Sequence, residues 1–421
     1  MDKLIIEGGN VLKGEVEISG AKNSCLPIMA ATLLTDEPCV IRNVPPLRDI
    51  YTMIRLLKSL GMKAEWSNYT VFVEPRRKQR KYLAPYHLVK TMRASVCVLG
   101  PLLAKLHKAE VSMPGGCVIG HRPIDLHLKG LSALGGEINI EHGYVVAKTK
   151  QLKGTRIYLG GPFGSSVLGT ANVMMAAVLA KGKTLIENAA CEPEVVDLAN
   201  FLLKMGAKIK GINTHILEIE GVKELKGVDY TVIPDRIEAG TYMIAGAITG
   251  GDLILKSANL EHMGAVVDKL RQTGVEINTD QGNIRVKRRK ELKPVEVTTL
   301  PYPGFPTDMQ AQMMALMTVT EGISVITEKI YPDRFMHVAE LNRMGAEIML
   351  EGASAIVKGV KSLSGAPVMA SDLRASAALV IAGLVARGKT EISRIYHLDR
   401  GYEAMEKKLS KLGARIRRLK E

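Results

Sequence analysis

The sequence predicts an α/β protein with two domains, each made of three repeated units. A length of 421 residues is too long for one ordinary hydrophobic core. One short phrase recurs six times at a spacing of about 70 residues, which is typical of a repeat architecture. A composition of 46% hydrophobic and 24% charged residues, with no low-complexity tract, is that of a folded globular chain rather than a disordered one.

The recurring phrase predicts a helix end followed by a short strand. In each copy an amphipathic run reaches a glycine and a β-rich segment follows, as in LLKMGAKIKG and LNRMGAEIML. Glycine just past a helix accepts the left-handed conformation without a Cβ clash. We therefore expect helix C-caps at six glycines: Gly61, Gly135, Gly206, Gly274, Gly345 and Gly413.

A second helical run that also ends in glycine lies upstream of each phrase, as in MIAGAITGGDLILKSA. The sequence pattern of each unit thus predicts secondary-structure elements in the order strand, helix, strand, helix, strand, strand. Six such units could form one ring or two groups of three, and the length favours two groups. The leading segment LIIEGGNVLKGEVEIS is similar to the strands that precede a unit. We expect it to complete the carboxy-terminal domain, so the predicted domains are 21–229 and 1–20 plus 230–421, and the chain crosses between them twice.

Polar residues recur at the predicted start of the first helix in every unit. They are Lys22, Arg93, Ser166, Arg236, Asp308 and Arg374. Arginines recur before the second helix of four units, at Arg48, Arg122, Arg334 and Arg400. Helix amino termini and arginine forks both bind phosphate or carboxylate, and the net charge of +14 also favours anionic ligands. The alternatives are aspartate N-caps with surface ion pairs, and a basic surface without a ligand.

The segment MPGGCVIGHRPIDLH predicts a reactive loop. Gly115 and Gly116 allow a tight, mobile loop, and the neighbours Arg122 and His121 should lower the pKa of the Cys117 thiol. Such a thiol can give or take a proton or attack carbon. The other cysteines, Cys25, Cys39, Cys97 and Cys191, are expected to pack as reduced thiols.

Other features predict a cytoplasmic protein without a metal or cofactor. The amino terminus carries two acidic residues and lacks the apolar core of a signal peptide. The longest apolar stretch, residues 375–386, is too short to span a bilayer. The cysteines and histidines lack the spacing of a metal site.

Several long phrases carry a resemblance to a known family: SGAKN, PGGCVIGHRPIDLH, IENAACEPEVVDLANFL, FPTDMQAQ, DRFMHV, DLRASAALV and RIYHLDRGYE. Along essentially its whole length the chain resembles the UDP-N-acetylglucosamine 1-carboxyvinyltransferases, the enolpyruvyl transferases of peptidoglycan precursor synthesis. The resemblance implies two inside-out α/β barrel (prism) domains, each of three βαβαββ units, with the active site in the inter-domain cleft. It also implies transfer of enolpyruvyl from phosphoenolpyruvate to the 3-hydroxyl of UDP-N-acetylglucosamine, the first committed step of that synthesis.

The resemblance assigns roles to residues of this chain. Phosphoenolpyruvate would be held by Lys22, Arg122 and Arg400, with Arg334 and Arg374 completing a basic cleft. Cys117 would add to or protonate phosphoenolpyruvate and would be the group that fosfomycin alkylates, while Asp308 would receive the proton of the sugar hydroxyl. The sugar nucleotide would contact Asn23, Arg93, Arg122, Pro123, Ile124, Asp125, Leu126, Ser166, Val167 and Ile330.

One departure and three alternatives remain. FGSSVLGT places Leu168 where many relatives have a small residue, which weakens the expected diphosphate contact of Ser166 and Val167. The sister enzyme that acts on shikimate 3-phosphate would explain the repeats but not the cysteine loop. A nucleic-acid-binding protein using RRKQRK (76–81) is disfavoured because only 4% of residues are aromatic. A catalytically inactive nucleotide-binding paralogue is disfavoured because Lys22, Cys117, Asp308 and Arg400 are all present.

Overall fold

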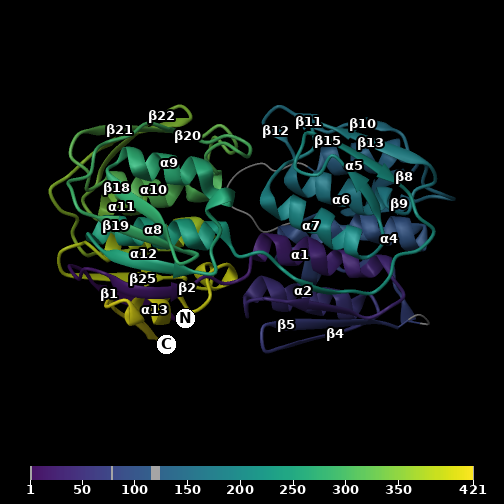
Figure 1. The fold of residues 1–421 in the computed structure, drawn as a ribbon, viewed down its shortest axis with the longest axis horizontal. Helices are drawn as coiled ribbons and strands as arrows, with labels where there is room; N and C mark the ends of the chain where they lie inside the picture. The colour runs from purple at the N-terminus through teal and green to yellow at the C-terminus, as the bar shows by residue number, and fades with distance from the viewer. Residues whose placement is uncertain (1, 77–78, 115–123, 421) are drawn as a thin grey trace. The chain divides into compact units, whose positions relative to one another are not determined.

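The computed structural model describes residues 2–76, 79–114 and 124–420, and these form two compact units (Figure 1). Unit 1 contains residues 2–19 and 234–420, and unit 2 contains the described residues between 20 and 233. The chain therefore passes from one unit to the other after Ser19 and returns after Ile233. No helix in the described ranges is both long and apolar enough to span a bilayer.

Unit 1 is built from helices and strands in regular alternation. Its helices and 3₁₀ turns are α8 (Arg236–Thr249), η4 (Leu260–Met263), α9 (Gly264–Gln272), η5 (Thr307–Met309), α10 (Gln310–Met317), α11 (His337–Arg343), α12 (Leu373–Gly383), η6 (Leu398–Arg400) and α13 (Met405–Lys411). Its strands are β1 (Lys3–Glu7), β2 (Lys13–Glu17), β17 (Asp252–Lys256), β18 (Val275–Asp280), β19 (Asn283–Arg288), β20 (Val297–Thr298), β21 (Ile323–Thr327), β22 (Glu347–Glu351), β23 (Ser354–Lys358), β24 (Pro367–Met369), β25 (Lys389–Ser393) and β26 (Arg415–Leu419).

Unit 2 follows the same alternation. Its helices and 3₁₀ turns are α1 (Lys22–Ala31), η1 (Thr32–Leu34), α2 (Arg48–Ser59), α3 (Tyr86–Val89), η3 (Arg93–Val98), α4 (Leu99–Leu106), α5 (Asp125–Ala133), α6 (Val167–Ala177) and α7 (Pro193–Lys204). Its strands are β3 (Cys39–Arg42), β4 (Met62–Ser67), β5 (Thr70–Pro75), β6 (Leu83–Ala84), β7 (Lys108–Ser112), β8 (Glu137–Glu141), β9 (Tyr144–Lys148), β10 (Arg156–Tyr158), β11 (Gly160–Gly161), β12 (Gly164–Ser165), β13 (Lys183–Glu187), β14 (Lys208–Lys210), β15 (Ile216–Glu220) and β16 (Asp229–Thr231).

Within the described ranges, six four-stranded sheets share one strand order, as the repeat predicts. Each has a lead strand parallel to its neighbour, and the remaining three strands pair antiparallel. The orders are β16-β3-β5-β4, β6-β7-β9-β8 and β10-β13-β15-β14 in unit 2, and β2-β17-β19-β18, β20-β21-β23-β22 and β24-β25-β1-β26 in unit 1.

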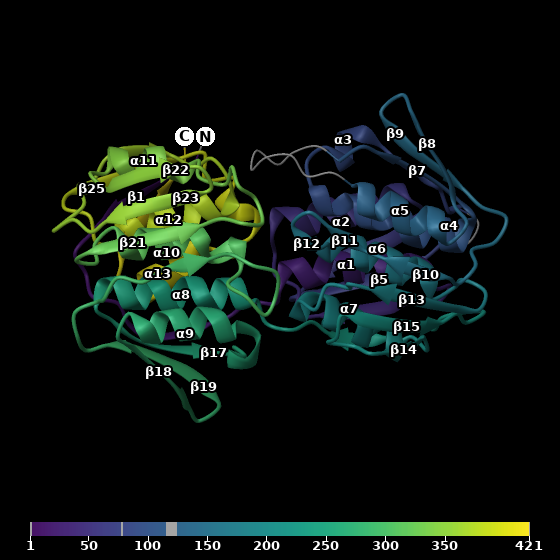
Figure 2. The same ribbon diagram turned by 90° about the horizontal axis from the view of Figure 1, so that it is seen from above.

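The amino-terminal strands complete the carboxy-terminal unit, which confirms the expectation for the leading segment. β2 is the parallel lead strand beside β17, and β1 lies between β25 and β26. Lys3 is paired with Leu419, so the first and last strands, β1 and β26, lie side by side in unit 1 (Figures 1 and 2).

The helices of each repeat differ in burial. In unit 1, α8, α10 and α12 pack against one another and are buried almost along their whole length (Figure 2). In unit 2, α6 packs against both α1 and α4, which are also mostly buried. The second helices, such as α2 and α9, keep a polar exposed face. This difference explains why the first helical run of each unit is almost continuously apolar and the second is amphipathic.

The predicted helix ends and buried thiols are confirmed. All six C-cap glycines have left-handed backbones, with φ between +87° and +102°. The four cysteines expected to pack, Cys25, Cys39, Cys97 and Cys191, are buried in unit 2.

Candidate active site

The six polar residues predicted at helix starts all lie at helix starts. Lys22 and Arg236 are the first residues of α1 and α8, Arg374 is the second residue of α12, and Ser166 is the N-cap of α6. Arg93 and Asp308 stand in the 3₁₀ turns η3 and η5, which lead into α4 and α10.

In unit 1 the repeat brings an aspartate and two arginines together. One carboxylate oxygen of Asp308 lies 2.8 Å from Nη1 of Arg334, and the other lies 3.1 Å from Nη2 of Arg374. The Arg334 and Arg374 side chains are only 7% and 2% exposed, whereas Asp308 is 27% exposed. The cluster therefore presents a partly open carboxylate that two buried guanidinium groups hold in place.

Both arginines keep their charge in this environment. Burial opposes the charge of Arg334, but the carboxylates of Asp308 and Asp372 outweigh it, and its pKa lies above the usual value. Burial also opposes the charge of Arg374, and there Tyr402, Asp308 and Asp235 raise the pKa. Two positive charges thus stay fixed at one place in the unit.

Aspartates next to these positions cap the helices. Asp372 accepts hydrogen bonds from the backbone N–H groups of Arg374 and Ala375, and Asp235 does the same for Ile237 and Glu238 at the start of α8. The aspartate N-cap interpretation is therefore right for these two aspartates. The surface ion pair interpretation is wrong for Arg374, because its side chain is buried.

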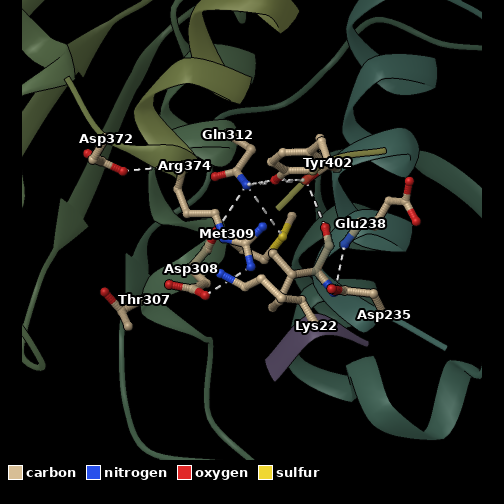
Figure 3. Close-up of polar contacts among 12 residues, drawn as sticks. Lys22, Asp235, Glu238, Thr307, Asp308, Met309, Gln312, Asp372, Arg374 and Tyr402 are labelled. Atoms are coloured by element: carbon tan, nitrogen blue, oxygen red, sulfur yellow. Dashed lines mark hydrogen bonds and ion pairs between the residues drawn. The ribbon is translucent and has the colours of Figure 1, made fainter. Parts of the chain in front are cut away.

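A polar network that the sequence did not predict adjoins Asp308 (Figure 3). Nε2 of Gln312 lies 3.0 Å from the backbone oxygen of Asp308 and 3.2 Å from both the Tyr402 and Thr241 hydroxyls. The guanidinium carbon of Arg374 lies 5.2 Å from the centre of the Tyr402 ring. A signal was present in the sequence: Gln312 follows Asp308 by one helical turn, and with Gln310 it is one of two polar residues in the apolar run 309–317.

Two other predicted residues of unit 1 lie close by in the chain. Arg400 is the last residue of η6 and is half-buried, two positions before Tyr402. Ile330 is half-buried, and its amide donates a hydrogen bond of 2.8 Å to the Glu328 carboxylate. A backbone contact from Ile330 to a ligand would therefore use its carbonyl oxygen.

In unit 2, Lys22 forms a buried ion pair. Its Nζ lies 3.1 Å from the carboxylate of Asp49 in α2, and the two side chains are 8% and 5% exposed. Breaking such a pair leaves an uncompensated buried charge, so α1 and α2 hold the ammonium group in one place. Asn23 follows on α1 and is half-buried, whereas Arg48 at the start of α2 is exposed.

The start of α1 is also tied to α7. The Ser24 hydroxyl donates to the buried Asp197 carboxylate, which also accepts from the Tyr230 hydroxyl at 2.5 Å and from the Ile233 amide at 3.3 Å. Burial raises the pKa of Asp197 above its usual value, although these donors lower it. The helix that carries Lys22 is thereby anchored at its first turn.

The expected nucleotide segment begins α5. Ile124 is the N-cap, Asp125 is exposed in the first turn, and Leu126 is half-buried. The next residue, His127, is buried and takes a hydrogen bond of 3.0 Å from the Asn172 side chain at Nδ1. Burial and the nearby charge of Arg93 lower the pKa of His127 to about 3, so the ring is neutral.

The expected diphosphate turn begins α6. The Ser166 hydroxyl accepts a hydrogen bond of 3.1 Å from the Gly169 amide, and Val167 is the first helical residue. Leu168 packs partly buried against the core of unit 2. A larger residue is therefore accommodated there by turning inward.

Three residues of the predicted site lie outside the described residues: Cys117, Arg122 and Pro123. Gly115, Gly116 and His121 of the same loop also lie there. In the rest of the chain, no group of three or more His, Cys, Asp or Glu side chains could hold a metal ion.

The fold is the one found in the enolpyruvyl transferases. The chain matches the family model for EPSP synthase (3-phosphoshikimate 1-carboxyvinyltransferase) over residues 6–409. The solved enolpyruvyl transferase NikO from Streptomyces tendae is similar, with a TM-score of 0.89, 25% identity, and 99% of this chain and 98% of that chain covered. EPSP synthase from Acinetobacter baumannii shares the fold with a TM-score of 0.75 and 18% identity, covering 100% of both chains.

Comparison with curated relatives identifies one family within the enolpyruvyl transferases. UDP-N-acetylglucosamine 1-carboxyvinyltransferase from Geotalea uraniireducens is 58% identical over 421 residues, with both chains fully covered. The enzymes of that name from Methylacidiphilum infernorum and Myxococcus xanthus are each 57% identical, over 419 and 423 residues; both matches span all of this chain, with 99% and 100% of those proteins covered. The chain belongs to the UDP-N-acetylglucosamine 1-carboxyvinyltransferase family.

Proposed function

We propose that the protein transfers the enolpyruvyl group of phosphoenolpyruvate to the 3-hydroxyl of UDP-N-acetylglucosamine and releases phosphate. The observation that carries the proposal is the pair of buried arginines on Asp308, in a chain 57% to 58% identical over its whole length to enzymes named for this reaction. The reaction would supply a precursor of peptidoglycan, and the proposed setting is the cytoplasm.

The chemistry requires an acid, a base and fixed cations. A proton adds to the methylene carbon of phosphoenolpyruvate, and the sugar oxygen bonds to the neighbouring carbon while its own proton leaves. The tetrahedral intermediate then loses phosphate from that carbon and a proton from the methyl group, which restores the double bond. Positive groups fixed around the carboxylate and phosphate stabilise the charges without reorganisation.

Residues of both units can fill these roles. Lys22 of unit 2, and Arg334, Arg374 and Arg400 of unit 1, supply the cations, together with Arg122. Asp308, partly exposed and oriented by two arginines, accepts the proton of the sugar hydroxyl. We assign the acid, or the group that adds to phosphoenolpyruvate, to Cys117, and the nucleotide contacts to Asn23, Arg93, residues 122–126, Ser166, Val167 and Ile330. The three buried helices in each unit, together with sheets whose strands alternate buried and more exposed residues, support the inside-out prism form of each domain.

Phosphate release tests the proposal. The intact protein is incubated with phosphoenolpyruvate and either UDP-N-acetylglucosamine or shikimate 3-phosphate. We expect release only with the sugar nucleotide, and a loss of about a hundredfold or more in Asp308→Asn and Cys117→Ala. Release only with shikimate 3-phosphate would assign the chain to the sister reaction, and release with neither acceptor would leave a binding-only protein.

A further inference from the structure

Glu328 is a fully buried carboxylate that the proposed chemistry does not use. It follows β21 and its exposure is 0%. One oxygen, Oε1, accepts hydrogen bonds from the Thr299 hydroxyl at 2.6 Å and from the amides of Ile330 and Tyr331 at 2.8 and 2.9 Å. The other oxygen, Oε2, accepts from the Thr307 hydroxyl at 2.9 Å.

Four donors from three chain segments hold this carboxylate. A buried carboxylate is costly unless hydrogen bonds replace its water, and bonds to an ionised acceptor are about twice as strong as neutral ones. Glu328 therefore fixes the end of β20, the turn η5 and residues 330–331 relative to one another. All three segments belong to unit 1.

The direction of the hydrogen bonds links Glu328 to the arginine–aspartate cluster. Arginine nitrogens only donate, so the Thr307 oxygen is the acceptor toward Arg334 and the single proton of its hydroxyl is directed at Glu328. The Thr307 oxygen then accepts from Nη1 of Arg334 at 3.0 Å, and the same nitrogen donates to Asp308 at 2.8 Å. Both hydrogens on that nitrogen are therefore used, which fixes the plane of the guanidinium group against Asp308.

A second link leads to Ile330. The Thr299 hydroxyl donates to Glu328 and accepts from the Lys329 amide at 2.9 Å, while the next two amides donate to Glu328 directly. Hydrogen bonds thus fix three consecutive amides, those of Lys329, Ile330 and Tyr331. The carbonyl oxygen of Ile330 is consequently presented in one direction.

We propose that Glu328 is a positioning residue for the transfer reaction: through Thr307 it orients Arg334 and Asp308, and through the Ile330 amide it orients the backbone that contacts the sugar nucleotide. This assignment rests on the proposed function. The assignment predicts two distinct effects. Loss of the Thr307 link should disturb Arg334 and Asp308, and loss of the Ile330 link should disturb the backbone contact to the sugar nucleotide. A carboxylate with a purely structural role would not give these distinct effects.

Kinetics of single variants test the two links. Thr307→Val removes the hydroxyl but leaves the bonds of Glu328 to Thr299, Ile330 and Tyr331. We expect kcat to fall by about tenfold to a hundredfold while KM for UDP-N-acetylglucosamine stays within about twofold, because misplaced catalytic groups cost this much. Thr307→Ser keeps a hydroxyl and should recover most of the loss. Glu328→Gln should lower kcat and also raise that KM.

Thr318→Val is the matched control. Thr318 is fully buried at the far end of α10, whereas Thr307 is half-buried, and the Thr318 hydroxyl donates to the Ala315 carbonyl at 2.7 Å. We expect a lower Tm and an unchanged kcat. An equal fall of kcat in Thr318→Val and Thr307→Val, or no fall in Thr307→Val, would overturn the positioning role.

A crystal structure of Thr307→Val separates this idea from the proposed function. If the unaltered protein releases no phosphate, the proposed function fails and the structure alone decides. A turned Arg334 guanidinium that has lost the Asp308 contact supports positioning, whereas a contact kept at 2.8 Å overturns it.

Discussion

Arg334, Arg374 and Lys22 carry their charges where little water reaches them. Each is at most 8% exposed and each faces a carboxylate, Asp308 for the two arginines and Asp49 for the lysine. In the proposed reaction, fixed charges of this kind would need no solvent reorganisation when the anionic substrate binds. Without substrate, the carboxylates of Asp49 and Asp308 compensate the buried positive charges and so reduce the cost of burying them.

His127 makes the stability of unit 2 depend on pH. Its pKa is about 3 in the folded chain and about 6.5 when exposed, so protons bind more readily to the unfolded chain. The stabilisation is fully present above about pH 6.5 and is lost as the pH falls toward 3. We expect unit 2 to lose about 2 kcal/mol between pH 7.5 and 5 through this group, and His127→Gln to remove that loss. Urea unfolding followed by the fluorescence of Trp66, the single tryptophan, measures it.

His87→Gln is the control for this prediction. His87 is exposed in α3, so its substitution should leave the pH dependence of the urea midpoint unchanged. A pH dependence that is the same in His127→Gln and in the unaltered protein would contradict the assignment to His127.

Residues that are recognisable from their place in the local sequence could be predicted. Residues whose role depends on hydrogen-bond partners far away in the sequence were missed. The places of Lys22, Asp308 and Arg374 at the starts of helical segments could be predicted because each occupies a matched position in its repeat. Glu328 could not be found, because its role comes from Thr299 and Thr307, which lie 29 and 21 residues away. The buried partner of His127, Asn172, lies 45 residues away and was missed for the same reason.

At the level of elements, the glycine after each second helix sets where that helix stops. Gly345 follows α11 with φ +88°, and a Cβ built there would meet nothing within 4 Å. Steric clash is therefore absent, and only the left-handed backbone disfavours a side chain. The prediction of six such glycines from sequence succeeded because this requirement is local to one residue.

Gly345→Ala and Gly264→Ala should change stability in opposite directions. Gly264 begins α9 in the same unit, has a right-handed helical backbone, and also has space for a Cβ. We expect Gly345→Ala to destabilise unit 1 by about 1 kcal/mol and Gly264→Ala to stabilise it by about 0.5 kcal/mol. Calorimetric melting of both variants measures the difference. A loss of stability in Gly264→Ala equal to that in Gly345→Ala would show that the backbone angle is not the cause.

Other elements were less regular than the repeat predicted. Arg93 and Asp308 stand in 3₁₀ turns before α4 and α10 rather than in the helices themselves. Pro306 precedes η5, and the Met309 amide closes a tight turn onto its carbonyl. Such short turns satisfy amides at a helix start, and periodicity alone does not reveal them.

At the level of the whole molecule, the repeat explains why the chain starts in unit 1 and finishes there. The sixth sheet lacks its third strand until β1 fills the place between β25 and β26, and the fourth sheet takes β2 as its lead strand. Unit 2 takes its last lead strand from β16 beside β3, so it is complete as the continuous stretch 20–233. The sequence predicted the exchange for the leading segment because that segment has strands without the helices of a full unit.

This topology predicts which fragments fold. Residues 234–421 alone lack a central strand of one sheet and the lead strand of another, so we expect them to show no cooperative urea transition. Because Lys3 pairs with Leu419, a linker of about four residues can join the end of β26 to the start of β1 as a hairpin. The chain 234–421, linker, 1–19 should then unfold cooperatively, and 20–233 should fold without help. Circular dichroism in urea distinguishes the three fragments, since a cooperative transition in 234–421 alone would mean that β1 and β2 are dispensable to the core of unit 1.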